Sequence, residues 1–163
     1  MISIKNFQLL ANFNAWANTK IFFSCKKLSN VEYKKDRLAF FSSIHGTLNH
    51  SLVVDRAYIS RIEGKDHGLE SLNQILQDDL SRLEEERIRE DNNLIHLVNN
   101  LSEENVNKPI TYKSFETGDQ NSTINLILIT LFNHQTHHRG QVHNMLSQAR
   151  VKPPQIDVLD FVA

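Results

Sequence analysis

Apolar side chains recur every three or four residues along four long stretches of this 163-residue sequence. A stripe with this period lies on one side of an α-helix, whereas a half-buried strand would need strict alternation. The stretches cover residues 4–28, 36–62 and 72–101, and a last one that begins at Ser122 or Thr123 and continues to about residue 149. The spacing therefore predicts four amphipathic helices.

Glycine and proline are rare, and most of them fall between the expected helices. Gly64 and Gly68 follow the second stretch, and Pro153 with Pro154 prevents the last helix from continuing. Residues 107–120 contain a proline, a glycine and the alternating string ITYKSF, so they are the one place for a short strand pair or an irregular excursion. We therefore expect an all-α fold, a four-helix bundle with a long crossover before the last helix.

Size, charge and cysteine content limit the classes of function. A chain of this length fits one domain, which we expect to span residues 1–163. The 18 basic and 19 acidic residues give a net charge of -1 without a clustered basic stripe, which argues against nucleic acid as a partner. Polar residues interrupt every apolar run near the N-terminus, so we expect neither a signal peptide nor a membrane span. Cys25 is the only cysteine, which excludes an intrachain disulfide and fits the cytoplasm.

Four of the eight histidines fall within the string NHQTHHRGQVH of the last expected helix. His134 and His138 are four residues apart, so their side chains lie one turn apart on the apolar face. An imidazole pair at this spacing can bridge one metal ion. The alternative is that each ring is a core residue whose nitrogens are satisfied by neighbouring groups. The motif lacks the glutamate of HExxH, so it does not imply metalloprotease chemistry.

A third ligand is expected from another helix, because metal sites in bundles are assembled from facing helices. The second stretch offers His45 and His50, which are five residues apart and therefore cannot share one face. Small and apolar neighbours favour His50, but periodicity alone leaves the choice open. His137 lies on a polar face and is expected at the surface. The remaining histidines show no pattern that indicates a site: His67, His96 and His143.

The strings SIHGTLNHSLVVDRAYISRI and LFNHQTHHRGQVHNMLSQ resemble the DinB-like family, also called the DNA-damage-inducible or YfiT-like family of metal-binding bundles. The resemblance covers most of the chain, and NHQTHHRGQ is its most specific part. It implies an up-down-down-up four-helix bundle, often a homodimer, that binds a divalent ion through three histidines. The family motif places these ligands at His50, His134 and His138, and it leaves His45 and His137 outside the ligand set.

Three histidines without a fourth protein ligand leave coordination positions open, which is typical of a reactive or exchangeable metal site. Nitrogen ligands suit zinc, nickel, iron or copper, and we favour zinc or nickel. Such an ion lowers the pKa of a bound water or holds a small thiol as its thiolate. Because relatives within the family include thiol-dependent S-transferases, the resemblance implies metal-dependent transfer of a low-molecular-weight thiol to a small electrophilic substrate.

Two other functions stay open: a non-catalytic metal-binding protein of the stress or DNA-damage response, and a metal-dependent hydrolase, which lacks a nearby general base. Arg139 follows His138 directly and is our catalytic candidate, because it could orient the site or contact an anionic substrate. A helix-end or dimer salt bridge is its alternative role. Asp55 is expected either to support a metal ligand or to be structural or solvent-facing. Cys25 is expected to be a small buried hydrophobe.

Overall fold

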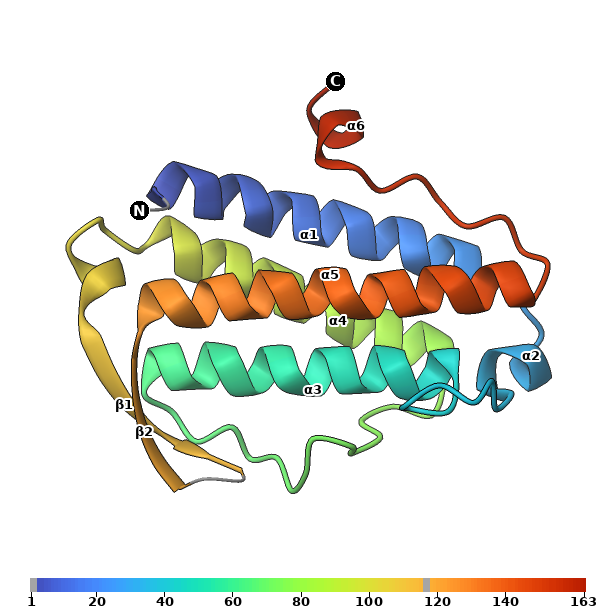
Figure 1. Cartoon of the computed structure of the whole chain (residues 1–163), viewed down its shortest axis with the longest axis horizontal. Coiled ribbons are helices and arrows are strands. Elements are labelled where there is room, and N and C mark those ends of the chain that lie inside the picture. The colour runs from blue at the N-terminus through green and yellow to red at the C-terminus, as the bar shows by residue number, and fades with distance from the viewer. Residues whose placement is uncertain (1–2, 116–117) are drawn as a thin grey trace.

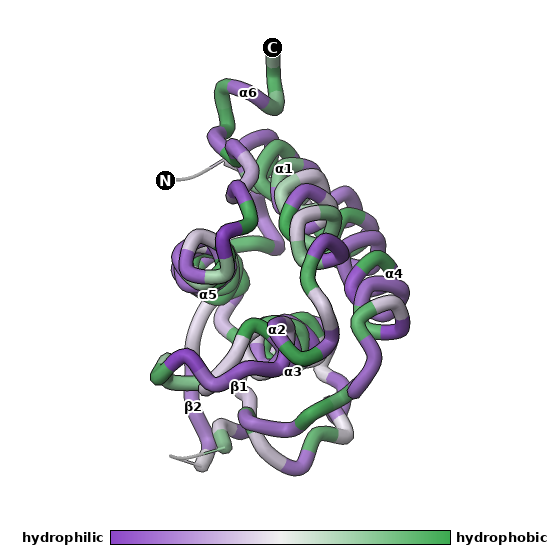
Figure 2. The backbone as a smooth tube through the Cα atoms, turned by 90° about the vertical axis from the view of Figure 1, so that its right-hand side faces the viewer, coloured by the Kyte–Doolittle hydropathy of each residue, from purple (hydrophilic) through white to green (hydrophobic). Residues whose placement is uncertain are grey.

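Four long helices dominate the computed structural model, which describes residues 3–115 and 118–163 (Figure 1). They are α1 (Ile4–Cys25), α3 (Ile44–Glu63), α4 (Leu80–Asn99) and α5 (Ile124–Gln148). α1 and α5 run in one direction, and α3 and α4 run in the opposite direction (Figure 1). Seen nearly end-on, the four helices surround one shared interior (Figure 2). The described chain is therefore mostly helical, as its periodicity predicts.

Each long helix begins with a polar side chain that caps its first turn. The capping oxygen atoms accept hydrogen bonds from backbone N–H groups two or three residues further along and belong to Ser3, Ser43, Asp79 and Thr123. A cap of this kind satisfies donors that have no partner within the helix and stabilises it by about 1 kcal/mol. Thr123 is one of the two caps predicted from the sequence for the last helix.

The second and third helices begin later than the sequence predicts. Residues 36–43 form a turn in which Leu38 and Ser42 have positive φ angles of 55° and 60°, a conformation that a helix does not accommodate. Residues 64–79 connect α3 to α4 outside helices and strands, although their apolar spacing predicted a helix from residue 72. Because α3 and α4 run in the same direction, this connection returns along α3 (Figure 1). We call residues 64–79 the return segment.

A short hairpin lies in the region where the sequence predicts a strand pair or an excursion. β1 (Pro109–Ser114) and β2 (Gly118–Thr123) pair antiparallel, with Pro109 opposite Thr123. The fold is therefore not purely helical, which corrects the all-α expectation: alternation in ITYKSF prevails over helix formation here. Residues 116–117 of the expected excursion lie outside the described residues.

Short helical pieces also occur outside the four predicted stretches. They are α2 (Asn30–Lys34), the 3-10 turn η1 (Asn105–Asn107) and α6 (Val158–Val162). α6 returns the C-terminal tail to α1, where the ring of Phe161 lies 5.6 Å from the ring of Trp16. Pieces of about one turn have too few hydrogen bonds to produce a clear periodic signal, and tertiary contacts hold them in place.

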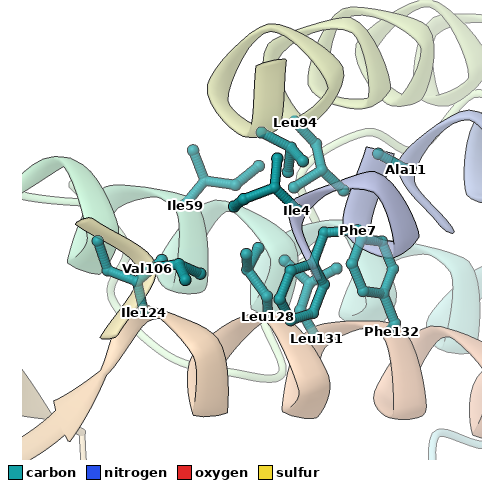
Figure 3. Close-up of a cluster of buried hydrophobic side chains, with 11 residues drawn as sticks. Ile4, Phe7, Ala11, Ile59, Leu94, Val106, Ile124, Leu128, Leu131 and Phe132 are labelled. Carbon is teal, nitrogen blue, oxygen red and sulfur yellow. The ribbon is translucent and has the colours of Figure 1, made fainter. Parts of the chain in front are cut away.

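The buried apolar side chains form two clusters, one toward each end of the long helices. The first contains Ile4, Phe7, Ala11, Ile59, Leu94, Val98, Val106, Ile124, Leu128, Leu131 and Phe132 (Figure 3). The second contains Ile21, Phe22, Cys25, Tyr33, Ile44, Leu48, Leu52, Leu83, Val142, Met145 and Leu146. Burial of one such leucine, isoleucine or phenylalanine contributes about 1.5–3 kcal/mol. Between the clusters, buried polar residues lie beside small apolar ones such as Ala17, Val54 and Ala57.

Hydropathy changes from residue to residue within each long helix, as the mixed colours in Figure 2 show. A membrane-spanning helix needs about 20 consecutive residues that are predominantly apolar. Within residues 3–115 and 118–163, none of the helices combines the length and the apolar character that a span requires.

Candidate metal centre

Three histidines on two neighbouring helices bring their Nε2 atoms together. His134 and His138 lie one turn apart on α5, and His50 lies on α3. His134 Nε2 is 3.1 Å from His50 Nε2 and 2.9 Å from His138 Nε2. One candidate ligand atom from each residue lies within 4.8 Å of the other two. The structure thus groups the three side chains that the family motif indicates, and we call them the three-histidine group.

Hydrogen bonds at the opposite ring nitrogens fix the tautomers of two members. His50 Nδ1 is 2.7 Å from the carbonyl oxygen of Leu72 in the return segment. A carbonyl oxygen only accepts, so Nδ1 is the nitrogen that carries the proton. His138 Nδ1 lies 2.8 Å from Gln141 Oε1, which also accepts. In both neutral rings Nε2 therefore carries a free lone pair, which is the form that binds a metal ion.

Burial keeps the three rings neutral. Burial, together with the smaller effects of the neighbouring His138 and His50, lowers the pKa of His134 from 6.5 to about 3. Burial also lowers the pKa of His138 to about 4, although the hydrogen bond to Gln141 opposes this shift. The pKa of His50 is lowered by burial as well. At neutral pH the group thus presents lone pairs rather than positive charges.

The donor set of the three-histidine group fits a divalent metal ion. Nε2 is unprotonated in His50 and His138, so both atoms need a donor. A single proton on His134 Nε2 can form a good hydrogen bond with only one of them. A tetrahedral site with Zn–N distances of about 2.0–2.1 Å places its nitrogens roughly 3.3 Å apart. The separations of 3.1 and 2.9 Å are close to that value. Among the described residues, the buried His134 Nδ1 has no hydrogen-bond partner.

Phe41 covers His50, and a cavity reaches the same histidine. The Phe41 ring stacks on the His50 ring with centroids 3.7 Å apart. This approach requires Gly46, because a Cβ atom there would lie 2.2 Å from the carbonyl oxygen of Phe41. The cavity has a volume of about 420 Å³, and we call it the entry cavity. Its lining residues are Phe40, Phe41, His50, Glu70, Ser71, Leu72, Asn73 and Phe115.

Comparison with known proteins places this geometry in a family. The family model for DinB matches residues 2–163. The chain belongs to the DinB family. Protein DinB of Bacillus subtilis (strain 168) is 30% identical over 149 residues, which are 86% of this chain and 84% of that protein. The resemblance predicted from the histidine strings is therefore confirmed.

A solved structure shows the same fold as this DinB-family chain. It is a crystal structure of a DinB-like protein from Bacillus cereus ATCC 10987, with a TM-score of 0.72 and 16% sequence identity. The match covers 95% of this chain and 98% of that chain, so the two share their arrangement of helices almost throughout. At this level of identity, the likeness concerns the fold alone.

Three other histidines of this DinB-family chain, His45, His67 and His137, lie outside the three-histidine group, although the ring of His137 lies 4.9 Å from that of His138. His45 Nε2 lies 3.2 Å from the carbonyl oxygen of Gln77, on a different side of α3 from His50. His137 is exposed, as its polar face predicts, and its Nε2 contacts the side chain of Gln141. His67 stacks on Phe115, with ring centroids 4.6 Å apart.

A second polar cluster fills the middle of the helical interior. We call it the interior polar layer; it consists of Asn14, Asn18, Asp55, Arg87, Asp91, Gln135 and Arg139, all of them buried. Arg87 Nη1 lies 2.7 Å from Asp55 Oδ2, and Arg87 Nη2 lies 3.0 Å from Asp91 Oδ1. Asn14 and Asn18 each donate to Asp91 Oδ1 at 3.1 Å. All four long helices contribute to this layer.

Two residues for which the sequence predicts a role near the metal, Arg139 and Asp55, belong to the interior polar layer. Arg139 points toward α1, where it donates to Asn14 and Asn18, rather than toward the histidines. Its catalytic role stays a prediction, without a contact to the three-histidine group to support it. Asp55 is fully buried and pairs with Arg87 and Gln135, which fits the expected structural role, whereas the expectation of a solvent-facing carboxylate is wrong. Burial raises the pKa of Asp55 to about 6, although Arg87 opposes the shift.

The sequence contains a signal for this layer. Asn14, Asp55 and Arg87 each occupy an inward position in the apolar stripe of a different helix. A polar residue at an inward position needs a partner, and three such residues on three helices can be partners for one another. Cys25 is buried, and the absence of water raises its pKa to about 12, which confirms the interpretation as a small buried hydrophobe.

Proposed function

We propose that this DinB-family protein binds one divalent ion, zinc or nickel, through His50, His134 and His138. The observation that carries the proposal is the convergence of three Nε2 atoms, two of which have their lone pairs fixed by hydrogen bonds on the far side of the ring. These lone pairs repel one another, and no described residue places a positive charge between them. A bound cation would convert their repulsion into coordination.

We further propose that the protein transfers a low-molecular-weight thiol to a small electrophile. In this reaction a sulfur–carbon bond forms, the bond from carbon to the leaving group breaks, and the thiol proton passes to solvent. The ion supplies Lewis acidity that favours the thiolate over the thiol at neutral pH. The chain provides access through the entry cavity, whose volume of about 420 Å³ lies within the range of small-molecule sites.

Residues around the group orient the site and limit water. The Leu72 carbonyl and Gln141 hold His50 and His138 in fixed ring orientations, so little reorganisation is needed when a ligand binds. The Phe41 ring covers one part of the imidazole surface and excludes water there. Glu70 and Asn73 supply polar groups at the entry cavity, where a substrate would pass.

The metal and the activity are tested with one pair of variants. Elemental analysis of purified wild-type protein should give about one zinc or nickel ion per chain, and His138→Ala should lose it. His137→Ala is the matched control, because it removes the neighbouring exposed histidine and should keep the metal. Wild-type protein that binds no metal more tightly than His138→Ala would overturn the metal proposal.

Turnover is measured on metal-loaded protein with a panel of small thiols and a chromogenic aryl halide. We expect metal-dependent conjugation in the wild type and in His137→Ala, and only the background rate in His138→Ala. A wild-type protein that holds its metal but conjugates no thiol of the panel would exclude the S-transferase. That result would favour a non-catalytic metal-binding protein of the stress response.

A further inference from the structure

Arg61, in the last turn of α3, has an unusual environment for a surface-facing arginine. Its Cζ atom lies 5.0 Å from the ring centroid of Tyr58 and 4.6 Å from that of Tyr112 on the hairpin. Its Nε atom is buried without a hydrogen-bond partner, and no described carboxylate lies within ion-pair distance of the guanidinium. Two tyrosine rings thus hold the cation in place, and no described carboxylate neutralises it.

Arg61 lines a cavity suited to an anion. The cavity has a volume of about 280 Å³, and we call it the hairpin cavity. Its lining residues are Tyr58, Arg61, Leu72, Tyr112, Ser114, Phe115, Ser122, Leu126, Ile127 and Thr130. Among these described residues Arg61 is the only one with a permanent charge. The hydroxyl groups of Ser122 and Thr130 already donate to backbone carbonyl oxygens, so the guanidinium is the group that would pair with a carboxylate.

The hairpin cavity adjoins the entry cavity of the candidate metal centre. Leu72 and Phe115 line both cavities. Tyr58, which lines the hairpin cavity, also lies near the three-histidine group, with its ring 6.5 Å from the ring of His134. The entry cavity contains the acidic Glu70, which would repel a negative group there and favour its passage toward Arg61.

The helix sets the separation between the two ends. Arg61 follows His50 by eleven residues, which is three turns of α3, so both lie on nearly the same side with Cα atoms roughly 16 Å apart. The Arg61 Cζ atom lies 5.0 Å from the Tyr58 ring centroid, which lies 6.5 Å from the ring of His134, so the guanidinium and that histidine are at most 11.5 Å apart. A metal–sulfur bond of about 2.3 Å and a guanidinium–carboxylate contact take up part of this gap, so a ligand shorter than the gap reaches both places.

We propose that Arg61, with Tyr58 and Tyr112, forms a carboxylate-binding subsite for a small molecule whose other end lies at the three-histidine group. This inference rests on the proposed function in one respect: it makes the thiol an acidic one. The guanidinium edge donates to the carboxylate in the plane, and the tyrosine rings keep the side chain from turning away.

The subsite is tested first without any metal. Metal-free full-length protein is titrated calorimetrically with hexanoate and, as the neutral match, with hexanol. In the wild type we expect hexanoate to bind at least about tenfold more tightly than hexanol. Arg61→Gln should bind both equally, and Arg61→Lys should keep part of the preference for the acid. Equal binding of acid and alcohol by the wild type, or an unchanged preference in Arg61→Gln, would overturn the subsite.

A second titration joins the two ends and separates this inference from the proposed function. Cobalt(II)-loaded protein is titrated with 4-mercaptobutanoic acid and with 4-mercaptobutanol, and the charge-transfer absorption of a cobalt–sulfur bond is followed. We expect the acid to bind about tenfold more tightly than the alcohol, and this advantage to disappear in Arg61→Gln. Equal affinities for the two compounds would reject the subsite while the thiol site stands. Absence of the absorption band with every thiol would reject the S-transferase, and the hexanoate titration would then decide the subsite alone.

Discussion

The molecule contains two clusters of polar side chains at a similar level along its helices, and they differ in how their charges are matched. In the interior polar layer, Arg87 lies between the carboxylates of Asp55 and Asp91 at ion-pair distances. In the three-histidine group, lone pairs of one kind face each other, and no described residue supplies the opposite charge. The charges of the first cluster are matched without a ligand, whereas the lone pairs of the second face no positive charge.

This difference separates a structural role from a binding role. A buried ion pair between helices favours one arrangement of those helices, and removal of one partner leaves an uncompensated charge in the interior. A set of convergent acceptors beside a cavity contributes little to folding and gains stability only when a cation arrives. Removal of either cluster should therefore affect stability and metal affinity to very different extents.

The largest effect is expected from Asp55→Ala in the interior polar layer. The substitution leaves Arg87 buried without one of its two carboxylates, so the free energy of unfolding should fall by about 3–5 kcal/mol. Urea denaturation of the metal-free protein measures this change. The matched control is Glu104→Ala, which breaks the exposed pair with Lys108 and should cost at most about 1 kcal/mol. Similar losses in both variants would show that the layer has no special role.

A somewhat smaller effect is expected when zinc or nickel is added to the wild type. Free metal at one hundred times its dissociation constant should raise the free energy of unfolding by about 2.7 kcal/mol. His138→Ala should lose this gain, whereas His137→Ala should keep it, and a chelator should reverse it. The measurement is thermal or urea unfolding with and without metal. Equal stabilisation of wild type and His138→Ala would place the metal elsewhere.

Acid should destabilise the metal-free protein through the three-histidine group. The pKa of His134 is about 3 in the folded chain and near 6.5 in the unfolded one. The unfolded chain therefore binds more protons between these values, so this contribution is complete above pH 6.5 and is lost as the pH falls toward 3.

The free energy of unfolding of the wild type should consequently fall more steeply below pH 6.5 than that of His134→Gln. Asp55, whose raised pKa acts in the opposite direction, is present in both proteins and cancels from the comparison. Urea titrations at a series of pH values provide the data. Parallel curves for the two proteins would mean that His134 is not held neutral by burial.

The smallest effect is expected from Phe41→Leu at the edge of the three-histidine group. Loss of the ring stacked on His50 should cost about 1 kcal/mol of stability and should speed the removal of metal by a chelator. Phe40→Leu is the control, because Phe40 is 84% exposed. Of the two phenylalanines, it is Phe41 whose ring stacks on His50. Equal rates of metal loss in both variants would remove the covering role of Phe41.

Helical phase was sufficient to predict part of this arrangement. It placed His134 and His138 on one buried face and His137 at the surface, because a four-residue step on a helix fixes relative direction. His50 needed the family motif, since periodicity cannot tell which side of α3 meets α5. The interior polar layer shows the same limit: each polar residue was visible on its own stripe, but the pairing of stripes depends on tertiary packing.

Segments outside the long helices were harder to predict. The apolar spacing from Leu72 onward resembles a helix, yet the chain there returns along α3 and the helix starts only after the Asp79 cap. The carbonyl of Leu72 that holds His50 therefore had no signal in the sequence. Alternation indicated the hairpin. The contact between Tyr112 of the hairpin and Arg61 could not be predicted, because the two residues are distant in sequence and meet only in the folded molecule.

The return segment has a consequence for how proteins of this kind diversify. The apolar clusters draw mainly on the long helices, while residues 64–79 and the hairpin supply much of the wall around both cavities. Substitutions, insertions or deletions in these walls can reshape what enters the site at little risk to folding. A lineage that keeps its helices and histidines can thus acquire new chemical preferences by changing a surface connection alone.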